Sequence, residues 1–165
     1  MLFTQVHCVE DGKVLLMQRH KEPNLGLWVA PGGKVEANEA PYECAVRELR
    51  EETGLVAHGS EFRGIVSLVM PELTTPMIHF LYLVSIFSGD LVADEREGKI
   101  AWHDVEHVSS LAMPQANAVF LPHVLNLSAG FYQAKYSYDA QWRLLEVSEK
   151  ERENGVLLAR QQERY

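Results

Sequence analysis

Short apolar segments broken by turn residues occupy the beginning and the middle of the chain. Phe3–Val9 and Lys13–Gln18 flank an Asp11-Gly12 pair, and this dipeptide between two apolar runs is typical of a β-hairpin turn. Two further runs, Ile65–Met70 and Met77–Phe87, are separated by a segment that contains two prolines and is typical of a loop. The pattern predicts four strands, the first two of them antiparallel neighbours.

Between these two pairs of strands, the apolar positions recur with the period of a helix. Asn38 is a good N-cap, Pro41 suits a first turn and Gly54 is a natural stop, so we predict a helix over Glu39–Thr53. At about 100° per residue, the apolar side chains gather on one face of this helix. That face consists of Tyr42, Ala45, Val46, Leu49 and Thr53.

The remainder of the chain contains both helix-like and strand-like patterns of apolar residues. Trp102–Leu111 and Pro114–Leu127 are expected to be helical at least in part, and Phe131–Tyr138 with Trp142–Val147 predicts a hairpin. The charged segment Ser148–Tyr165 has helical propensity, although a glycine in its middle weakens that prediction. We expect residues 1–130 to form one domain, with 131–165 as its C-terminal extension. The expected core stripe of the second helix is Ala118, Phe120, Leu121, Val124 and Leu125.

Composition narrows the class of protein. With 165 residues, 47% of them hydrophobic, the chain is long enough for one buried core. A net charge of −8 disfavours long nucleic acid as a partner. The longest apolar run, Phe80–Phe87, is too short to span a membrane, and the N-terminus does not resemble a signal peptide. We therefore expect a soluble, cytoplasmic protein, with Cys8 and Cys44 reduced and structural.

The predicted helix carries a group of carboxylates at the edge of its apolar face. Glu48, Glu51 and Glu52 fall within one arc of about 100°. Like charges at this spacing repel, and a divalent cation relieves the repulsion. Oxygen ligands favour Mg²⁺, with Mn²⁺ as an alternative. The other interpretation is a solvated acidic helix face, but the tight turn at Gly32-Gly33 and the reach of Arg47 favour a metal site.

The sequence around this helix resembles the signature of the Nudix hydrolases. The segment from Trp28 to Glu36 reads WVAPGGKVE, and Gly33, Glu39 and the run from Arg47 to Leu55 follow with the spacing of the Nudix box. The resemblance implies an α/β/α sandwich, in which a mixed β-sheet lies between helices. It also implies Mg²⁺-dependent cleavage of a nucleoside diphosphate linked to another group.

The resemblance assigns roles to individual residues. Glu48, Glu51 and Glu52 resemble the metal-binding and catalytic glutamates, Gly32 resembles the residue whose carbonyl binds metal, and Glu39 with Arg47 resembles the pair that fixes the loop against the helix.

A fourth metal-binding carboxylate is expected from a later loop. Glu97 resembles that residue, although Asp94 and Glu95 are competing choices. The alternative is that this whole run is a solvated charged loop.

Within the family, the MutT-type 8-oxo-dGTP diphosphatases are the nearest likeness. Asn117, in the segment PQAN, resembles an asparagine that reads the oxidised purine, and Arg19 resembles a phosphate-binding arginine. The alternatives are that Asn117 caps a helix or faces solvent and that Arg19 is a solvated strand end. Gly33 and Lys34 complete the expected substrate contacts.

These features predict hydrolysis of a nucleoside triphosphate, such as 8-oxo-dGTP, to the monophosphate and pyrophosphate, in the manner of nucleotide-pool sanitation. Another nucleoside diphosphate derivative, such as a dinucleoside polyphosphate, ADP-ribose or an undamaged nucleotide, is the second hypothesis, and a non-catalytic nucleotide-binding module is the third. His103 and His107 have helical spacing but no further ligand, so a zinc site is not expected. The sequence leaves monomer and homodimer open.

Overall fold

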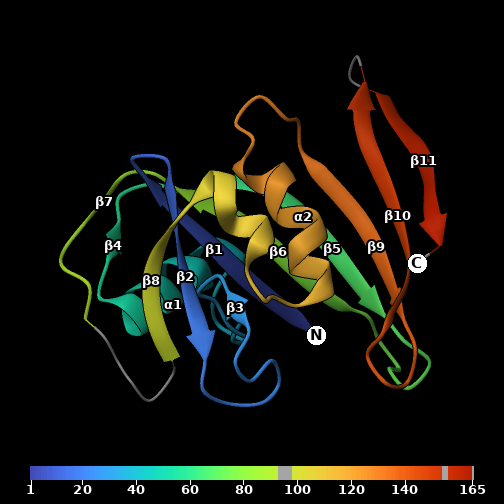
Figure 1. Cartoon of the computed structure of the whole chain (residues 1–165), viewed down its shortest axis with the longest axis horizontal. Helices are drawn as coiled ribbons and strands as arrows, with labels where there is room; N and C mark the ends of the chain where they lie inside the picture. The colour runs from blue at the N-terminus through green and yellow to red at the C-terminus, as the bar shows by residue number, and fades with distance from the viewer. Residues whose placement is uncertain (93–97, 154–155, 165) are drawn as a thin grey trace.

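The computed structural model describes residues 1–92, 98–153 and 156–164. In that part of the chain, nine strands form one mixed sheet with the order β11-β10-β9-β5-β6-β1-β2-β3, and β8 pairs with β2 (Figure 1). These strands are β1 Leu2–Glu10, β2 Lys13–Arg19, β3 Trp28–Val29, β5 Glu61–Val69, β6 Met77–Val84, β8 Gly98–Asp104, β9 Tyr132–Tyr138, β10 Leu144–Glu153 and β11 Val156–Arg164. The other elements are α1 Pro41–Thr53, the 3₁₀-helix η1 Val105–Ser110, α2 Gln115–Leu125, and the short pair β4 Val56–Ala57 and β7 Phe87–Ser88.

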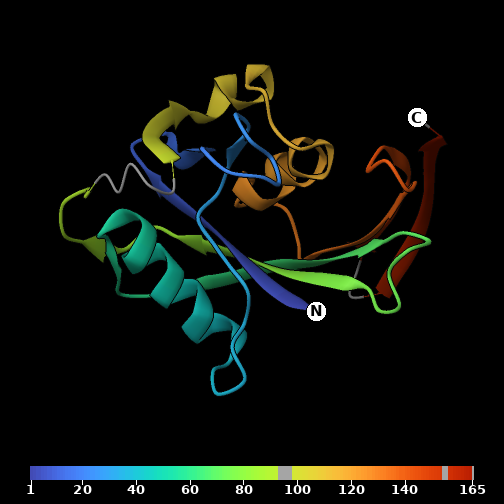
Figure 2. The ribbon, with the colours of Figure 1, turned by 90° about the horizontal axis from the view of Figure 1, so that it is seen from below.

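Helices cover both faces of the sheet. Figure 2 shows α1 below the sheet, and α2 with η1 above it. Side chains that alternate along the strands supply the two cores. On β2, for example, Leu15 packs in the cluster beneath α1, whereas Val14 and Leu16 pack in the cluster beneath α2. The predicted α/β/α arrangement around a mixed sheet is therefore confirmed.

The first hairpin determines where the loop before α1 runs. Asp11 and Gly12 both have positive φ, 48° and 73°, as a type I′ turn requires. The two strands then diverge, because β1 and β2 pair only through Val9↔Val14 and Glu10↔Lys13. The loop of residues 31–35 takes the freed side of β1, through hydrogen bonds such as Thr4 N–H to the Gly33 carbonyl at 2.9 Å. This pairing places the two loop glycines between β1 and α1.

Helix α1 begins two residues later than predicted. Its N-cap is Ala40, not Asn38, and the Glu43 carboxylate accepts the backbone N–H of Ala40 at 2.7 Å. The helix ends as expected at Gly54, which has a φ of 79° and donates its N–H to the Arg50 carbonyl. The predicted apolar face was wrong at Tyr42, which is 54% exposed. This residue lies in the first turn, where the helix extends beyond the core.

The C-terminal half contains more strand than the sequence suggested. Residues from Trp102 to Asp104 belong to β8 and pair with β2, so only η1 is helical in that predicted helix. The hairpin of β9 and β10 is confirmed. The helical prediction for Ser148–Tyr165 was wrong, because β10 continues to Glu153 and pairs with β11. Local helical propensity is a weak preference that sheet pairing overrides.

Packing around α2 also differs in detail from the expected stripe. Ala118 is exposed, whereas Ala116 and Asn117 are buried with Phe120, Leu121 and Val124. On β9, Tyr132, Tyr136 and Tyr138 are buried as packing residues. Trp142, expected in the next strand, lies in the turn with a φ of 60° and is 52% exposed.

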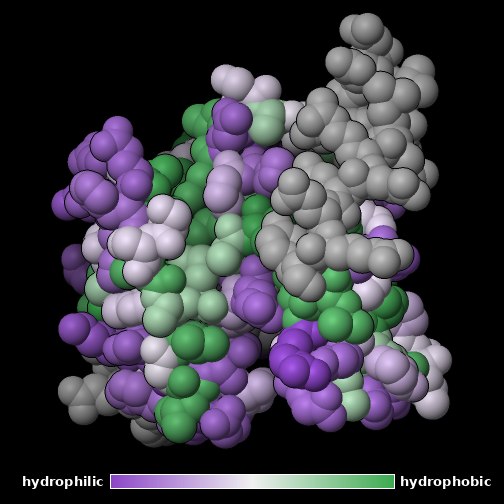
Figure 3. Space-filling view, turned by 45° about the vertical axis from the view of Figure 1, so that its right-hand side comes forward, coloured by the Kyte–Doolittle hydropathy of each residue, from purple (hydrophilic) through white to green (hydrophobic). Residues whose placement is uncertain are grey.

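The surface combines charged regions with exposed apolar side chains. Figure 3 shows apolar residues in a broken band down one face, bordered by hydrophilic residues. Among the described residues, no helix combines the length and the apolar character that crossing a membrane requires.

Candidate active site

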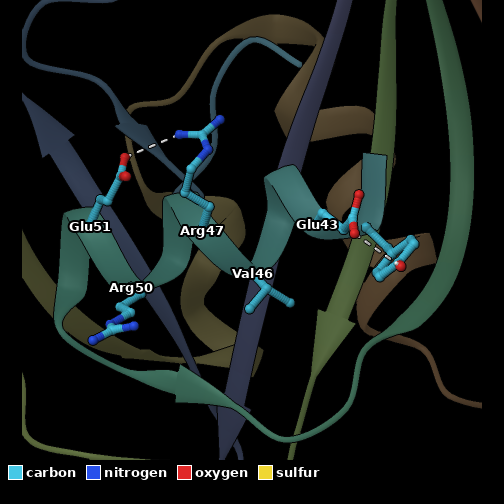
Figure 4. Close-up of a pocket in the computed structure, with 6 residues that line it drawn as sticks. Glu43, Val46, Arg47, Arg50 and Glu51 are labelled. Carbon is cyan, nitrogen blue, oxygen red and sulfur yellow. Dashed lines mark hydrogen bonds and ion pairs between the residues drawn. The ribbon is translucent and has the colours of Figure 1, made fainter. Parts of the chain in front are cut away.

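Arg47 holds the carboxylates of α1 together. Its guanidinium binds Glu39 through two hydrogen bonds, from Nη2 to Oε1 at 2.7 Å and from Nε to Oε2 at 3.0 Å. Its Nη1 also donates to Glu48 Oε1 at 2.8 Å and to Glu51 Oε2 at 3.1 Å. Figure 4 shows Arg47 and Glu51 projecting from the same side of α1. The Arg47 guanidinium therefore holds two carboxylates of α1, Glu48 and Glu51, and links them to Glu39 in the loop before the helix.

The two loop glycines lie directly against the carboxylates. The Gly32 N–H donates to Glu52 Oε2 at 2.8 Å. A Cβ at Gly33 would lie 2.1 Å from Glu48 Oε1, and a Cβ at Gly32, which has a φ of 153°, would lie 2.1 Å from the Thr4 carbonyl oxygen. Only glycine leaves room for both approaches. The loop backbone and the side chains of α1 thus meet at one place.

The environment changes the charge states of this group. The two hydrogen bonds from Arg47 lower the pKa of Glu39 to about 2, so Glu39 is ionised throughout the neutral range. Burial raises the pKa of Glu48, an effect that Arg47 partly opposes. The same carboxylates raise the pKa of Arg47, which stays charged. Burial thus disfavours the ionised form of Glu48, and a cation would stabilise that form.

The donor set fits a divalent cation, although its side chains are turned toward other partners. Among the side chains that the structure describes, no three His, Cys, Asp or Glu residues are placed to hold a metal ion. Arg47 bridges Glu48 and Glu51, and Glu52 turns to the loop. A bound cation would compete with Arg47 and with the Gly32 N–H for these carboxylate oxygens. Glu97, with Asp94 and Glu95, lies outside the described residues.

Asn117 lies on the α2 side of the sheet, in a space lined mainly by apolar side chains. It is 8% exposed and donates from Nδ2 to Gln5 Oε1 at 3.2 Å. Asn117 therefore neither caps α2, whose N-cap is Pro114, nor faces solvent. The space also borders His7, Trp28, Met113 and Phe120, and it is too closely packed to hold a ligand as it stands. A base beside Asn117 requires some of these side chains to move.

The remaining predicted substrate residues lie on loops and strand ends. Arg19, at the end of β2, donates from Nε to the Pro23 carbonyl at 2.8 Å. Lys34 is exposed in the loop that pairs with β1, and its carbonyl accepts from Arg47 Nη2 at 3.5 Å. The structure therefore joins Lys34 to the Arg47 group, whereas Arg19 is held by its own loop.

The sequence did not identify several polar residues that lie on the same side of the sheet as Asn117. Gln5 and His7 alternate on the same face of β1, and His79 on β6 stacks on Phe3 at 5.1 Å between ring centroids. His7 is buried and its Nδ1 lies 3.1 Å from the Tyr82 carbonyl, so the neutral ring donates from Nδ1. Both ring nitrogens of His79 are buried and have no hydrogen-bond partner among the described residues. The alternation of side chains along a β-strand places Gln5 and His7 on one face, but no local pattern identified Asn117 as their neighbour.

The predictions for the cysteines and for the paired histidines can be judged directly. Cys8 and Cys44 are free and buried, and burial raises their pKa values to about 12 and about 11. Both thiols therefore stay protonated and structural. His103 lies in β8 and His107 in η1, so they do not share one helix face.

A separate cavity of about 630 Å³ lies against the outer side of α1. Six residues of that helix line it, namely Tyr42, Glu43, Val46, Arg47, Arg50 and Glu51. Arg50 and Val46 project from the side of α1 opposite to Arg47 and Glu51 (Figure 4). This open hollow adjoins the Arg47 group and not the space at Asn117.

Comparison with known sequences and structures relates this geometry to a family. A NUDIX domain model matches residues 4–124. An uncharacterised Nudix hydrolase of Bacillus subtilis, YvcI, is 30% identical over 138 residues, which are 82% of this chain and 85% of that protein. An 8-oxo-dGTP diphosphatase of Haemophilus influenzae is 32% identical over 124 residues, 74% of this chain and 88% of the relative.

Structural similarity extends into the C-terminal part of the chain. The crystal structure of a MutT protein from Bacillus halodurans aligns with a TM-score of 0.81 and 30% identity, covering 90% of this chain and 96% of that one. Other matching relatives are named for different substrates, ADP-ribose and CTP. The family is thus common to these proteins, and the substrate differs among them.

Proposed function

The chain belongs to the Nudix hydrolases, which act on nucleotide derivatives and generally use divalent metal ions, and we propose that it hydrolyses a nucleoside triphosphate to the monophosphate and pyrophosphate with Mg²⁺. The preferred substrate in this proposal is an oxidised purine nucleotide such as 8-oxo-dGTP. The observation that carries the reaction class is that Glu48 and Glu52 lie against the Gly32-Gly33 backbone, while Arg47 joins Glu48 to Glu51.

The carboxylates of α1 would hold the metal ion. Glu48, Glu51 and Glu52 provide oxygen ligands, and we assign the Gly32 carbonyl to the same site. Glu97 completes this assignment by family resemblance. A bound divalent ion neutralises phosphate charge and lowers the pKa of a bound water, effects worth several kcal/mol. Because Mg²⁺ typically binds only one or two carboxylates of a protein, the remaining glutamates are free to accept a proton.

Arg47 and Glu39 keep these ligands in place. Glu39 accepts the Glu36 N–H at 2.9 Å as well as the two bonds from Arg47. The loop is therefore fixed to α1 even when Glu48 and Glu51 turn away from Arg47.

A glutamate that takes the proton of the attacking water adds about 10²–10⁴-fold to the rate. Glu48 and Glu52, which flank the loop glycines, are the two candidates for this base.

We assign recognition of the base to Asn117, with Arg19 and Lys34 as phosphate contacts and Gly33 as a backbone contact. The buried position of Asn117, next to an aromatic residue and a methionine, supports a site for a flat ring once those side chains move. The relative named for 8-oxo-dGTP supports the substrate class. The second candidate is another nucleoside diphosphate derivative, which the relatives named for ADP-ribose and CTP favour.

A substrate panel tests the proposal. The purified protein is incubated with Mg²⁺ and 8-oxo-dGTP, dGTP, CTP, ADP-ribose and diadenosine polyphosphates, and kcat/KM and products are compared. We expect 8-oxo-dGTP to be preferred and to yield pyrophosphate. A better sugar or dinucleoside substrate would contradict the proposed substrate and leave the metal assignment intact.

The metal assignment has its own test. We expect Glu52→Gln to lose on the order of 10²–10⁴-fold in kcat, because the amide is a poorer ligand and no base. The exposed residue Glu72 provides a matched control, Glu72→Gln. Unchanged melting temperatures would show that both variants are folded, and near-normal Mg²⁺-dependent turnover of Glu52→Gln would contradict the assignment.

A further inference from the structure

The side chain of Asn117 is oriented by a residue from the opposite end of the chain. Gln5 lies 112 positions earlier, on β1, and its Oε1 accepts a hydrogen from Asn117 Nδ2 at 3.2 Å. Among the described residues, the Asn117 side chain makes this one hydrogen bond. It commits one Nδ2 hydrogen, so the second Nδ2 hydrogen and the Oδ1 acceptor remain for a ligand.

The backbone around Asn117 is also fixed. The Leu144 N–H of β10 donates to Gln115 Oε1 at 2.9 Å. Strand β10 thus holds the first turn of α2. With the backbone held from one side, Gln5 on the other side decides how the amide of Asn117 is turned.

The orientation of this amide determines which purine edge it can bind. Guanine presents two acceptors, N7 and O6, on its major-groove edge. Oxidation at C8 converts N7 into an N–H donor beside the O6 acceptor. An amide that offers one acceptor and one donor matches the oxidised edge, and it places an acceptor against N7 of the normal base.

We propose that Gln5 is a positioning residue for base selection, which holds the Asn117 amide so that its acceptor and its remaining donor face the oxidised purine edge. This inference rests on the proposed function, since it assumes that Asn117 contacts the base. Neither the Nudix box nor any local motif includes Gln5. Its role follows from the part-buried hydrogen bond with Asn117 and from its position on the face of β1 that also carries His7.

Two substitutions separate the orienting role from a packing role. Gln5→Leu keeps the approximate size and removes the acceptor. Gln5→Glu keeps the acceptor, and a carboxylate holds Asn117 in the same orientation because it only accepts. Asn117→Ala removes the group that contacts the base. Gln133→Leu on β9, where the side chain is exposed, is the matched control.

The readout is the ratio of kcat/KM for 8-oxo-dGTP to that for dGTP, together with calorimetric affinities for 8-oxo-dGMP and dGMP. We expect Gln5→Leu to lower the ratio about tenfold, which corresponds to the loss of one hydrogen bond. The loss should appear as a higher KM for 8-oxo-dGTP and a weaker affinity for 8-oxo-dGMP. Gln5→Glu should keep the wild-type ratio within about threefold. Gln133→Leu should keep the ratio, and Asn117→Ala should abolish the preference.

Each other outcome overturns a specific step. If Asn117→Ala loses the preference and Gln5→Leu keeps it, Gln5 does not position Asn117, and the proposed function stands. If Gln5→Leu lowers the melting temperature without changing the ratio, Gln5 serves packing alone. A wild-type ratio near one would overturn the proposed substrate and this inference together, because no oxidised edge would then be read.

Discussion

Two arginines on opposite sides of the sheet hold two regions of the molecule in different ways. Arg47, with a side chain 27% exposed, binds the carboxylates of Glu39, Glu48 and Glu51. Arg63, 7% exposed, donates to the backbone carbonyls of Val124, Asn126 and Ala129, and also to Glu61. The first arginine holds charged groups that a cation can compete for. The second binds backbone carbonyls at the end of α2, where its side chain is almost fully buried.

The same contrast holds for the carboxylates. Glu48 lies beside a loop at the surface of the site, with its side chain 15% exposed. Glu149, 3% exposed, accepts from the Tyr132 hydroxyl at 2.7 Å, and that hydroxyl also contacts Tyr136 at 2.6 Å. Groups around α1 can exchange partners, whereas those around α2 are enclosed. Glu48 can therefore serve chemistry, whereas Glu149 stabilises the fold through Tyr132.

The largest expected effect compares the two arginines. Arg63→Leu leaves the α2 carbonyls buried without a donor, so we expect a loss of about 3–5 kcal/mol in the free energy of unfolding. Arg47→Leu removes partly exposed ion pairs and should lower the free energy of unfolding by about 1 kcal/mol. Urea titration of both variants measures these values. Equal losses would remove the distinction between the two regions.

The two loop glycines sharpen the comparison within the α1 region. Gly32→Ala forces a Cβ against the Thr4 carbonyl and should cost about 2 kcal/mol of stability. Gly33→Ala displaces only the end of the Glu48 side chain, so it should lower kcat while the melting temperature changes little. Thermal unfolding and kinetics of both variants test this. A similar loss of stability at both positions would show that Glu48 is not free to move.

A smaller effect is expected at His79 on the α2 side, whose buried ring nitrogens have no hydrogen-bond partner in the described part of the chain. Burial lowers its pKa from 6.5 to about 4. Below pH 6.5 the unfolded chain binds the proton and the folded chain does not, so the folded state loses stability as pH falls toward 4. His79→Leu removes this loss and the cost of the unpaired nitrogens, and should stabilise by about 1 kcal/mol at neutral pH.

His79→Leu is measured by denaturant unfolding at pH 7 and pH 5. We expect the gain over the wild type to be larger at pH 5. His7, whose pKa burial also lowers to about 4, remains in the variant and retains part of the pH dependence. A gain that shrinks at pH 5 would contradict a neutral, buried His79.

The smallest effect concerns Glu39 at acidic pH. Its pKa is lowered from 4.5 to about 2 by Arg47, so its contribution to stability is present above pH 4.5 and is lost as pH falls toward 2. Glu39→Gln should flatten this part of the stability profile. Thermal unfolding between pH 5 and pH 2.5 measures it, with Glu36→Gln as an exposed neighbouring control. A profile for Glu39→Gln that matches the wild type would contradict the lowered pKa.

Prediction from sequence succeeded where structure depends on near neighbours. The first hairpin follows from Asp11-Gly12, and the end of α1 follows from Gly54. Prediction failed where a segment has weak preferences and a distant partner. Residues 148–153 and 156–164 are strands because β10 has β9 beside it, and the three residues that follow Ala101 are strand because β2 lies beside them.

The sequence by itself determined the helix that carries Glu48, Glu51 and Glu52, because spacings of three and four residues place side chains on one helical face. The tight turn predicted at Gly32-Gly33 was wrong, because residues 31–35 run alongside β1 and hydrogen-bond to it. The tertiary structure alone decided that Gln5 meets Asn117 and that Arg63 binds the end of α2. Those contacts join positions more than sixty residues apart, and no local pattern of hydrophobicity or charge encodes the pairing of distant strands and helices.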